Sequence, residues 1–412
     1  MASFGIPLSG LEADSSWLNV ISNNLANLNT DGFKDQGVNF GDIFYQMQGT
    51  SGNGDPIQVG TGVQVASTTS NFTNGSVSAT GISSNMALQG NGFFVVDTAS
   101  GAQSYTRDGD FSTNSAGQLV TSGGQLVMGY PAVNGVVSTG GALVPISVNQ
   151  EGTIPGSTTT NFQTTTNLDS SAAVGDTFST PITVFDSVGT PQTLTVQYTN
   201  TGANTWSYNI TLPASATGAA TATTVSSGSM TFDSSGNLTS PAGSVTGINI
   251  TGLADGAAPM DLTWNLTDAS GNSTITRLDS ASSTSATSQN GFGVGTLTGF
   301  TVAADGTVEG QFTNNQTQAL GQVAIASFGN NQGLTQTSSG DYIPTTASGI
   351  AVVGQAGAGG NGTIQGGAVE ESNVDLSTEF ANMIVAQQGY EANAKALTTF
   401  DQVSQATIQL IT

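Results

Sequence analysis

The last stretch of the chain, residues 371–412, carries apolar side chains at alternating steps of four and three and contains no proline. This heptad spacing predicts one long helix with a narrow apolar stripe. Gly389 lies inside it and disfavours the helix by about 1 kcal/mol relative to alanine. A helix with a single narrow stripe needs a partner that covers it. The predicted stripe consists of Leu376, Phe380, Met383, Gln387, Tyr390, Ala394 and Leu397, and continues after a phase shift through Phe400, Val403, Thr407 and Leu410.

A second heptad pattern lies at the opposite end of the chain, within residues 1–32. Its members, seven apart in two series, are Leu11, Leu18 and Leu25, and Ile21 and Leu28. The pattern stops at an asparagine-rich run before Gly32, where helices commonly end. We therefore predict that the two terminal helices pair as a coiled coil. The simpler interpretation is a two-helix cap on an ordinary domain; the sharper one is that these helices join copies of the chain to one another.

Asparagines gather at the end of the first helix and recur in the last one. Asn23, Asn24, Asn27 and Asn393 are the candidates for amides that fix helix register. Buried amides can do this in coiled coils by hydrogen bonding between neighbouring helices. The alternative is a fraying helix end, because asparagine is a poor helix former.

Short alternating apolar runs separated by turn signals fill the chain between the two helices, and they predict β-structure. We expect a mostly β protein with helical termini and two nested β-domains. The predicted parts are a helix (1–32), a connecting segment (33–70), an inner β-domain in two pieces (71–143 and 291–367), an outer sandwich or barrel (144–290) and a final helix (368–412). Hairpin turns are expected at Asn74-Gly75, Asp108-Gly109 and Asp305-Gly306, and a flexible glycine-rich connector at 354–367.

Composition narrows the chemistry further. The 412 residues include no Cys and no His, which removes thiolate sites and the commonest general base and metal ligand. Four Lys and Arg stand against 27 Asp and Glu, for a formal charge of −23, so binding to nucleic acid or to an anionic membrane is disfavoured. The glycine clusters lack the Lys-Ser/Thr ending of a phosphate loop, and the acidic residues fall mostly on turns. We expect no enzyme, no cofactor and no metal site.

The start of the chain does not have the pattern of an ordinary secretory signal. The first basic residue is Lys34, and no apolar stretch is long enough to span a bilayer, so no membrane insertion is expected. The cysteine-free, Thr- and Ser-rich composition is nevertheless typical of extracellular proteins. Our hypothesis is export by a route that reads an uncleaved segment.

Several motifs are similar to those of one protein family. Residues 8–11 with 20–34 resemble the N-terminal signature of bacterial flagellar rod and hook proteins, and residues 372–376, 383–387 and 390–395 resemble their C-terminal signature. Residues 91–96 and 105–111 resemble the family's inner β-domain. Residues 185–189 and Trp206 resemble the outer domain of hook proteins, which the shorter rod proteins lack.

The resemblance implies a hook subunit: an extracellular structural protein of the flagellum that polymerises into a flexible tube, couples rod to filament and transmits torque. It implies self-association, contacts with rod, hook-cap and hook–filament junction proteins, and passage through the flagellar export apparatus. A distal rod protein is the alternative, and a secreted β-rich adhesin module a more remote one. The family often has Arg where this chain has Gln388, which argues against an ion pair at that position.

Overall fold

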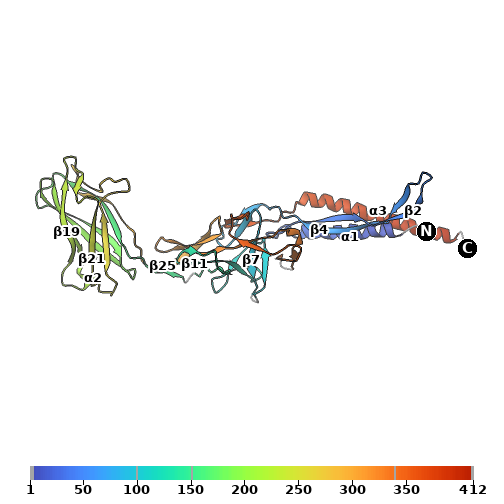
Figure 1. Cartoon of the computed structure of the whole chain (residues 1–412), viewed down its shortest axis with the longest axis horizontal. Helices are drawn as coiled ribbons and strands as arrows, with labels where there is room; N and C mark the ends of the chain where they lie inside the picture. The colour runs from blue at the N-terminus through green and yellow to red at the C-terminus, as the bar shows by residue number, and fades with distance from the viewer. Residues whose placement is uncertain (1–3, 99–100, 150–151, 338–339, 410–412) are drawn as a thin grey trace. The chain divides into compact units, whose positions relative to one another are not determined.

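The computed structural model describes residues 4–98, 101–149, 152–337 and 340–409. The chain divides into two compact units, coloured along the sequence in Figure 1. Unit 1 comprises Met1–Asn149, Gly299–Gln311 and Thr317–Thr412, and unit 2 comprises Gln150–Thr298 and Phe312–Gln316. One β-rich unit is therefore inserted into the other, in agreement with the predicted fold class. The domain limits proposed from the sequence stay predictions.

Two long helices belong to unit 1. Helix α1 (Gly5–Ala26) ends at Asn27, and helix α3 (Leu376–Gln409) begins after Asp375. The Asp375 carboxylate accepts the backbone N–H groups of Ser377 and Thr378 at 2.8 and 3.1 Å. It thus satisfies two of the donors that every helix start leaves without an intrahelical acceptor.

The remaining elements of unit 1 are short strands and one 3₁₀ turn. They are β1 (Gln36–Asp42), β2 (Tyr45–Thr50), β3 (Pro56–Gly60), β4 (Val63–Ser70), β5 (Val77–Ala79), β6 (Met86–Gln89), β7 (Phe93–Asp97), β8 (Gln103–Thr106), β9 (Ser112–Thr113), β10 (Leu119–Val120), β11 (Leu126–Val133), β12 (Val136–Val137), β13 (Val144–Pro145), β26 (Thr307–Phe312), β27 (Thr317–Val323), β28 (Ile325–Ser327), η1 (Asn331–Gly333), β29 (Thr335–Gln336), β30 (Tyr342–Ile343), β31 (Val352–Gly354), β32 (Thr363–Gly366) and β33 (Ala368–Glu370). Strand β25 (Gly295–Val302) runs across the boundary between the units.

The main sheet of unit 1 follows the order β25-β26-β27-β11-β7-β8-β30-β29. Its central strand β7 is apolar at four successive positions. Phe93 and Val95 join one buried cluster, whereas Phe94 and Val96 join another. Since successive side chains of a strand point to opposite faces, this sheet is covered on both sides, which explains the unbroken apolar run.

Unit 2 is a sandwich of two five-stranded sheets, ordered β21-β22-β15-β23, with β24 on β15, and β16-β17-β18-β19-β20. One core between them includes Trp206 and Trp264. Strand alternation generates it: Leu194, Val196 and Tyr198 are fully buried, with polar residues between them. Its elements are β14 (Thr153–Ile154), β15 (Asn161–Asp169), β16 (Thr177–Phe185), β17 (Pro191–Gly202), β18 (Thr205–Leu212), α2 (Ala214–Thr217), β19 (Thr223–Phe232), β20 (Leu238–Ser240), β21 (Ser244–Ile250), β22 (Met260–Asn265), β23 (Ile275–Leu278) and β24 (Ser283–Gln289).

Some local expectations differ from the structure. The predicted connecting segment contains two antiparallel pairs, β1 with β4 and β2 with β3. The turn predicted at Asn74-Gly75 joins no paired strands, because β5 pairs with β33. The same holds for Asp108-Gly109, because β8 pairs with β7 and β30 while β9 pairs with β10. Long-range pairing outweighs turn propensity at both sites.

The predicted turn at Asp305-Gly306 and the predicted glycine-rich connector at 354–367 differ in how they compare with the structure. The Asp305-Gly306 turn does join neighbouring strands, β25 and β26. The glycine-rich stretch 354–367, by contrast, is not a free connector, because β32 pairs with β6 and Ile364 is buried in the core.

The core of unit 2 yields a stability prediction. Trp264 is fully buried, lies 5.9 Å from the Phe162 ring and donates its indole N–H to the Thr164 hydroxyl at 3.3 Å. Trp264→Ala should lower the unfolding free energy by about 3–5 kcal/mol, measured by chemical denaturation of the full chain. Val188→Ala, at an exposed site in the same unit, should change it by less than about 0.5 kcal/mol. Equal effects of the two substitutions would contradict this assignment of the core.

Candidate assembly surface and its buried anchor

Helices α1 and α3 pack antiparallel along each other in unit 1 (Figure 1). Phe4 near the start of α1 meets Phe400 near the end of α3, with ring centroids 6.3 Å apart. In the middle of the pair, the Asn393 amide donates to the Asp14 carboxylate at 2.9 Å. The intramolecular contact thus contains a polar link between the two helices.

Two glycines allow the helices to approach closely around that link. A Cβ on Gly10 would lie 2.6–2.8 Å from the Asn393 amide group, and one on Gly389 would lie 3.0–3.2 Å from the Asp14 carboxylate. Both glycines therefore have a packing role. Gly389 disfavours the helix, but a larger residue at this position would crowd the Asp14 side chain of the partner helix.

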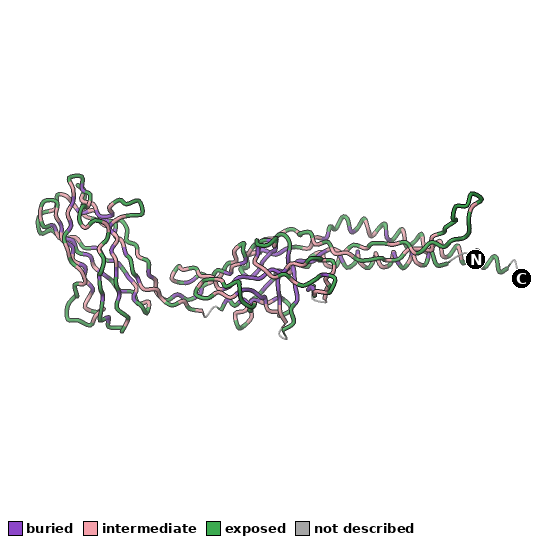
Figure 2. Tube along the Cα trace, in the orientation of Figure 1, coloured by how far each residue is buried: buried purple, intermediate pink, exposed green. Residues whose placement is uncertain are grey.

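Several large apolar side chains of α3 remain exposed outside this contact. Ala386 is buried, whereas Phe380 and Ile384 are 49% and 55% exposed. Figure 2 shows the contrast with the β-part, where buried segments are concentrated in strands while both helices are mostly exposed or intermediate. In a single chain, the helix pair comes closest at small and polar residues and leaves a large part of the apolar surface of α3 open.

The predicted stripe residues divide accordingly. Ile21 is buried; Leu11, Leu18, Leu25, Leu28, Met383, Leu397 and Phe400 are half-buried; Leu376, Phe380, Tyr390 and Val403 are exposed; and Leu410 lies outside the described residues. Their role in assembly stays a prediction.

The four predicted register amides have different surroundings. Asn393 contacts the other helix, as described above. Asn24 is buried and bonds the backbone of Gln36 twice, donating to its carbonyl at 2.9 Å and accepting its N–H at 3.0 Å. The Asn27 amide donates to the carbonyl of Asn23 within one turn of α1. Asn24 therefore fastens α1 to the segment that follows it.

A buried ionic cluster ties together three segments of unit 1 that are distant in the sequence. Lys34 follows α1, Arg107 follows β8, and Glu370 ends β33, six residues before α3 begins. The Lys34 ammonium donates to Glu370 Oε1 at 2.6 Å, and Arg107 Nη1 donates to Glu370 Oε2 at 3.3 Å. The Gly75 N–H also donates to Oε1 at 2.8 Å, and Lys34 donates to the Thr73 carbonyl at 2.9 Å. All three side chains are almost fully buried.

The cluster is charge-unbalanced, with two cations around one carboxylate. Backbone carbonyls compensate: Arg107 donates to Leu88 at 3.2 Å and to Gly90 at 2.7 Å, and its guanidinium lies 5.4 Å from the Phe93 ring centroid. Burial lowers the pKa of the Lys34 ammonium, and the Glu370 carboxylate opposes that shift. Burial also lowers the pKa of Arg107, against the same carboxylate.

Sequence reasoning did not find this cluster, although a signal was present. The chain has four basic residues in all, and two of them lie within the motifs at residues 20–34 and 105–111. Because basic residues are so scarce in this chain, Lys34 and Arg107 were candidates for buried ion pairs with an acidic residue. The partner could not be chosen from the sequence, because 27 acidic residues were available.

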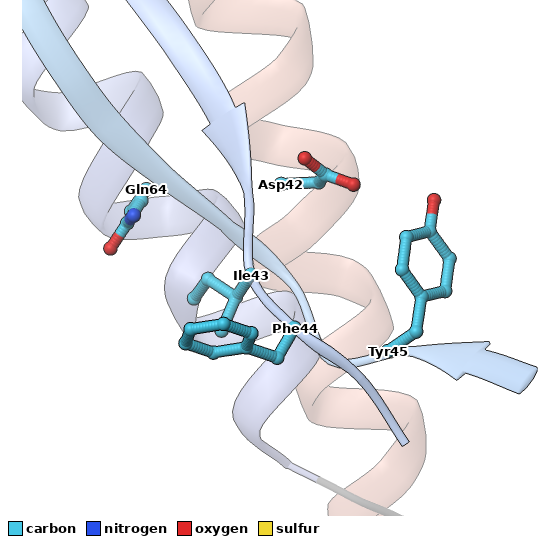
Figure 3. A pocket seen from close by; sticks show the side chains of 5 residues that line it. All are labelled: Asp42, Ile43, Phe44, Tyr45 and Gln64. Atoms are coloured by element: carbon cyan, nitrogen blue, oxygen red, sulfur yellow. The ribbon is translucent and has the colours of Figure 1, made fainter. Parts of the chain in front are cut away.

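The described residues hold no group of three potential metal ligands, and none of their helices is long and apolar enough to cross a membrane. An open pocket of about 330 Å³ lies where β1 passes into β2, lined by Asp42, Ile43, Phe44, Tyr45 and Gln64. Figure 3 shows these five side chains around the link between the two strands.

Four family models match successive segments of the chain. They are described as flagella basal body rod protein (residues 7–34), flagellar hook protein FlgE/F/G D1 domain (87–156), flagellar basal body protein FlaE D2 domain (156–292) and flagellar basal body rod FlgEFG protein C-terminal (365–410). Terminal helices, an inner β-part and an inserted β-domain therefore define the class: an axial structural protein of the bacterial flagellum.

Full-length relatives narrow the class. Flagellar hook protein FlgE of Salmonella typhimurium is 35% identical over 99% of this chain and 100% of the relative. FlgE of Escherichia coli K12 is 35% identical with the same coverage, and FlgE of Treponema pallidum is 31% identical over 100% of this chain and 99% of the relative. The crystal structure of Helicobacter pylori FlgE2 matches with a TM-score of 0.50 at 14% identity, over 71% of this chain and 100% of that one, which shows similarity of fold.

The chain belongs to the flagellar hook protein FlgE family. It is a structural subunit of the hook, located in the flagellum and serving motility. This family consists of structural proteins and is not a family of enzymes. The hook prediction is confirmed over its distal-rod and adhesin alternatives.

The buried ionic cluster of Lys34, Arg107 and Glu370, which we call the anchor cluster, yields a second prediction. Glu370→Gln removes the charge that compensates Lys34 and Arg107 and should lower the unfolding free energy of unit 1 by about 3–5 kcal/mol. The neighbouring substitution Glu371→Gln, at an exposed side chain, should change it by less than about 0.5 kcal/mol. Chemical denaturation of both full-length variants provides the comparison. An equal response would show that the buried pairing does not stabilise the unit.

A third prediction concerns pH. Burial raises the pKa of Asp108 to about 6; the hydrogen bond from the Asp110 backbone N–H opposes this shift, and the negative charges of Asp110, Asp31 and Asp341 add to it. Because the folded carboxyl holds its proton more tightly than the unfolded one, unit 1 should gain stability as pH falls from 7 to about 4, and gain nothing further from this group below that. Asp108→Asn should remove this part of the slope, on the order of 1–2 kcal/mol, while its side-chain oxygen can still accept the Asp110 N–H. Thermal unfolding at pH 7.5 and 4.5 tests it; an unchanged slope in the variant would assign the titration elsewhere.

Proposed function

We propose that the outward apolar side chains of α3, together with those of α1, form the surface through which hook subunits polymerise. The observation that carries this proposal is the exposure of Leu376, Phe380, Ile384 and Tyr390 along one flank of α3, whereas the closest approach to α1 is made at Gly389 and Asn393. A helix pair with so much open apolar surface is incompletely stabilised alone, and copies of itself supply the cover. Contacts that repeat head to tail without closing produce a helical polymer.

The role that follows is a flexible tube coupling rod to filament and transmitting torque. The specific partners that we propose for this subunit are the rod, the hook cap, the hook–filament junction proteins and the flagellar export apparatus. Unit 2 supports bending because it presents many Ser and Thr side chains, as along β24, which suit contacts that form and break at low energetic cost. We propose no enzymatic activity, since the chain lacks His and Cys and its carboxylates are dispersed.

A paired substitution on α3 tests the assembly surface in the full chain. Phe380→Ser combined with Ile384→Ser should raise the concentration of free subunit in equilibrium with polymer by roughly a hundredfold. Full burial of a large apolar side chain contributes about 1.5–3 kcal/mol, and about half of each of these two side chains is still exposed in the single chain, so the pair contributes about 1.5–3 kcal/mol in total. Sedimentation and electron microscopy measure free subunit and tubes.

Gln388→Ser is the matched control, because it lies at an exposed polar position on α3 and costs the helix at least as much propensity as either substitution in the pair; it should polymerise almost as the parent does. Both proteins should retain the thermal unfolding of their β-rich parts. Normal polymerisation of the paired variant would remove this flank of α3 from the interface.

A further inference from the structure

The hairpin formed by β2 and β3 has almost no support from its own chain. Its strands pair with each other from Tyr45 with Gly60 to Thr50 with Pro56, and every residue of the two strands is exposed except half-buried Gly60. A two-stranded hairpin is marginally stable alone in water. Something outside the single chain must therefore stabilise this one.

The exposed surface of the hairpin is apolar on both faces. Register places Tyr45 and Met47, 59% and 65% exposed, on one face, and Ile57 and Val59 on the other. Phe44 at the base is 90% exposed and lines the pocket of Figure 3. Apolar residues on both faces suit insertion between two neighbours better than contact on one side.

Charge favours a second copy of this chain as the neighbour. The chain carries −23, so two copies repel wherever acidic surfaces meet. Across residues 45–60 the only ionisable charge is that of Asp55 in the connecting turn. The hairpin is therefore a place where like-charged copies can approach.

The hairpin is also continuous with the helices. At its base, Ile43 N–H donates to the Gly62 carbonyl at 2.9 Å, and the next residue, Val63, donates its N–H to the Ser9 hydroxyl of α1 at 3.2 Å. Resting on the proposed function, we infer that the β2–β3 hairpin inserts between neighbouring copies in the polymer, buries Tyr45, Met47, Ile57 and Val59 there, and extends the interface made by the helices.

A photocrosslink tests this contact. Because the chain contains no cysteine, Met47→Cys supplies a single thiol for a benzophenone maleimide. Irradiated polymer should give dimers and larger products on a denaturing gel, and dilute free subunit should give monomer alone. Failure of the labelled subunit to polymerise, while unlabelled Met47→Cys does so, also supports the contact. Monomer alone from irradiated polymer, or a crosslink within one chain by mass spectrometry, would overturn it.

A second measurement does not depend on the label. Met47→Ser should raise the free-subunit concentration about tenfold, whereas Gln58→Ser, its cross-strand partner, should leave it within about twofold. Equal values for Met47→Ser and the parent chain would count against the inference. If the parent chain forms no tubes, the proposed assembly function itself fails; if it forms tubes that lack the hairpin contact, only this inference does.

Discussion

The buried contact of Glu370 with Lys34 and Arg107 is the constraint on which unit 1 depends. Glu370 is 336 residues from Lys34 and 263 from Arg107 in the sequence, and Lys34 and Glu370 lie near the ends of the terminal helices. Removing ions from water is costly unless their geometry and hydrogen bonds compensate, so the cluster holds only while all three segments are in place. It thereby fixes where the chain leaves α1 and where it enters α3 relative to the sheet. The helices proposed to meet neighbouring copies are in this way connected to the β-core of unit 1, as a subunit proposed to transmit force would require.

The helix pair has a different balance of interactions. Gly10, Gly389 and the Asp14–Asn393 hydrogen bond define where the helices cross, and none of them buries much apolar area. A dry leucine seam would stabilise the pair more strongly. It would also bury the side chains that the proposed contacts with further copies use. Because small and polar groups set the closest approach, Phe380 and Ile384 stay exposed in the single chain and remain available for the proposed polymerisation.

The sequence predicted the elements better than their contacts. Heptads located both helices and alternation located the sandwich core, because periodicity reports which face of an element is buried. Periodicity does not report which element covers that face: Leu376 and Tyr390 follow the predicted stripe but are 43% and 42% exposed in the single chain. Gly75 and Gly109 suggested hairpins by local propensity, whereas each is needed where backbones from distant segments touch. The anchor cluster depends on three segments meeting, and no local pattern encodes that meeting.

Scarcity of positive charge then limits how copies can bind. Of the four cations, Lys34 and Arg107 are used inside unit 1, and Arg277 inside unit 2 donates to the Ser170 carbonyl at 2.6 Å and the Asn204 amide oxygen at 3.0 Å. That leaves Lys395, exposed on α3, for any ion pair with another copy. One exposed pair contributes at most about 1 kcal/mol, far less than a few buried aromatic or aliphatic side chains. Burial of apolar surface must therefore supply most of the attraction between copies. Because the chain is acidic overall, acidic surfaces of two copies repel each other. Strong contacts between copies are thus confined to surfaces with few charges.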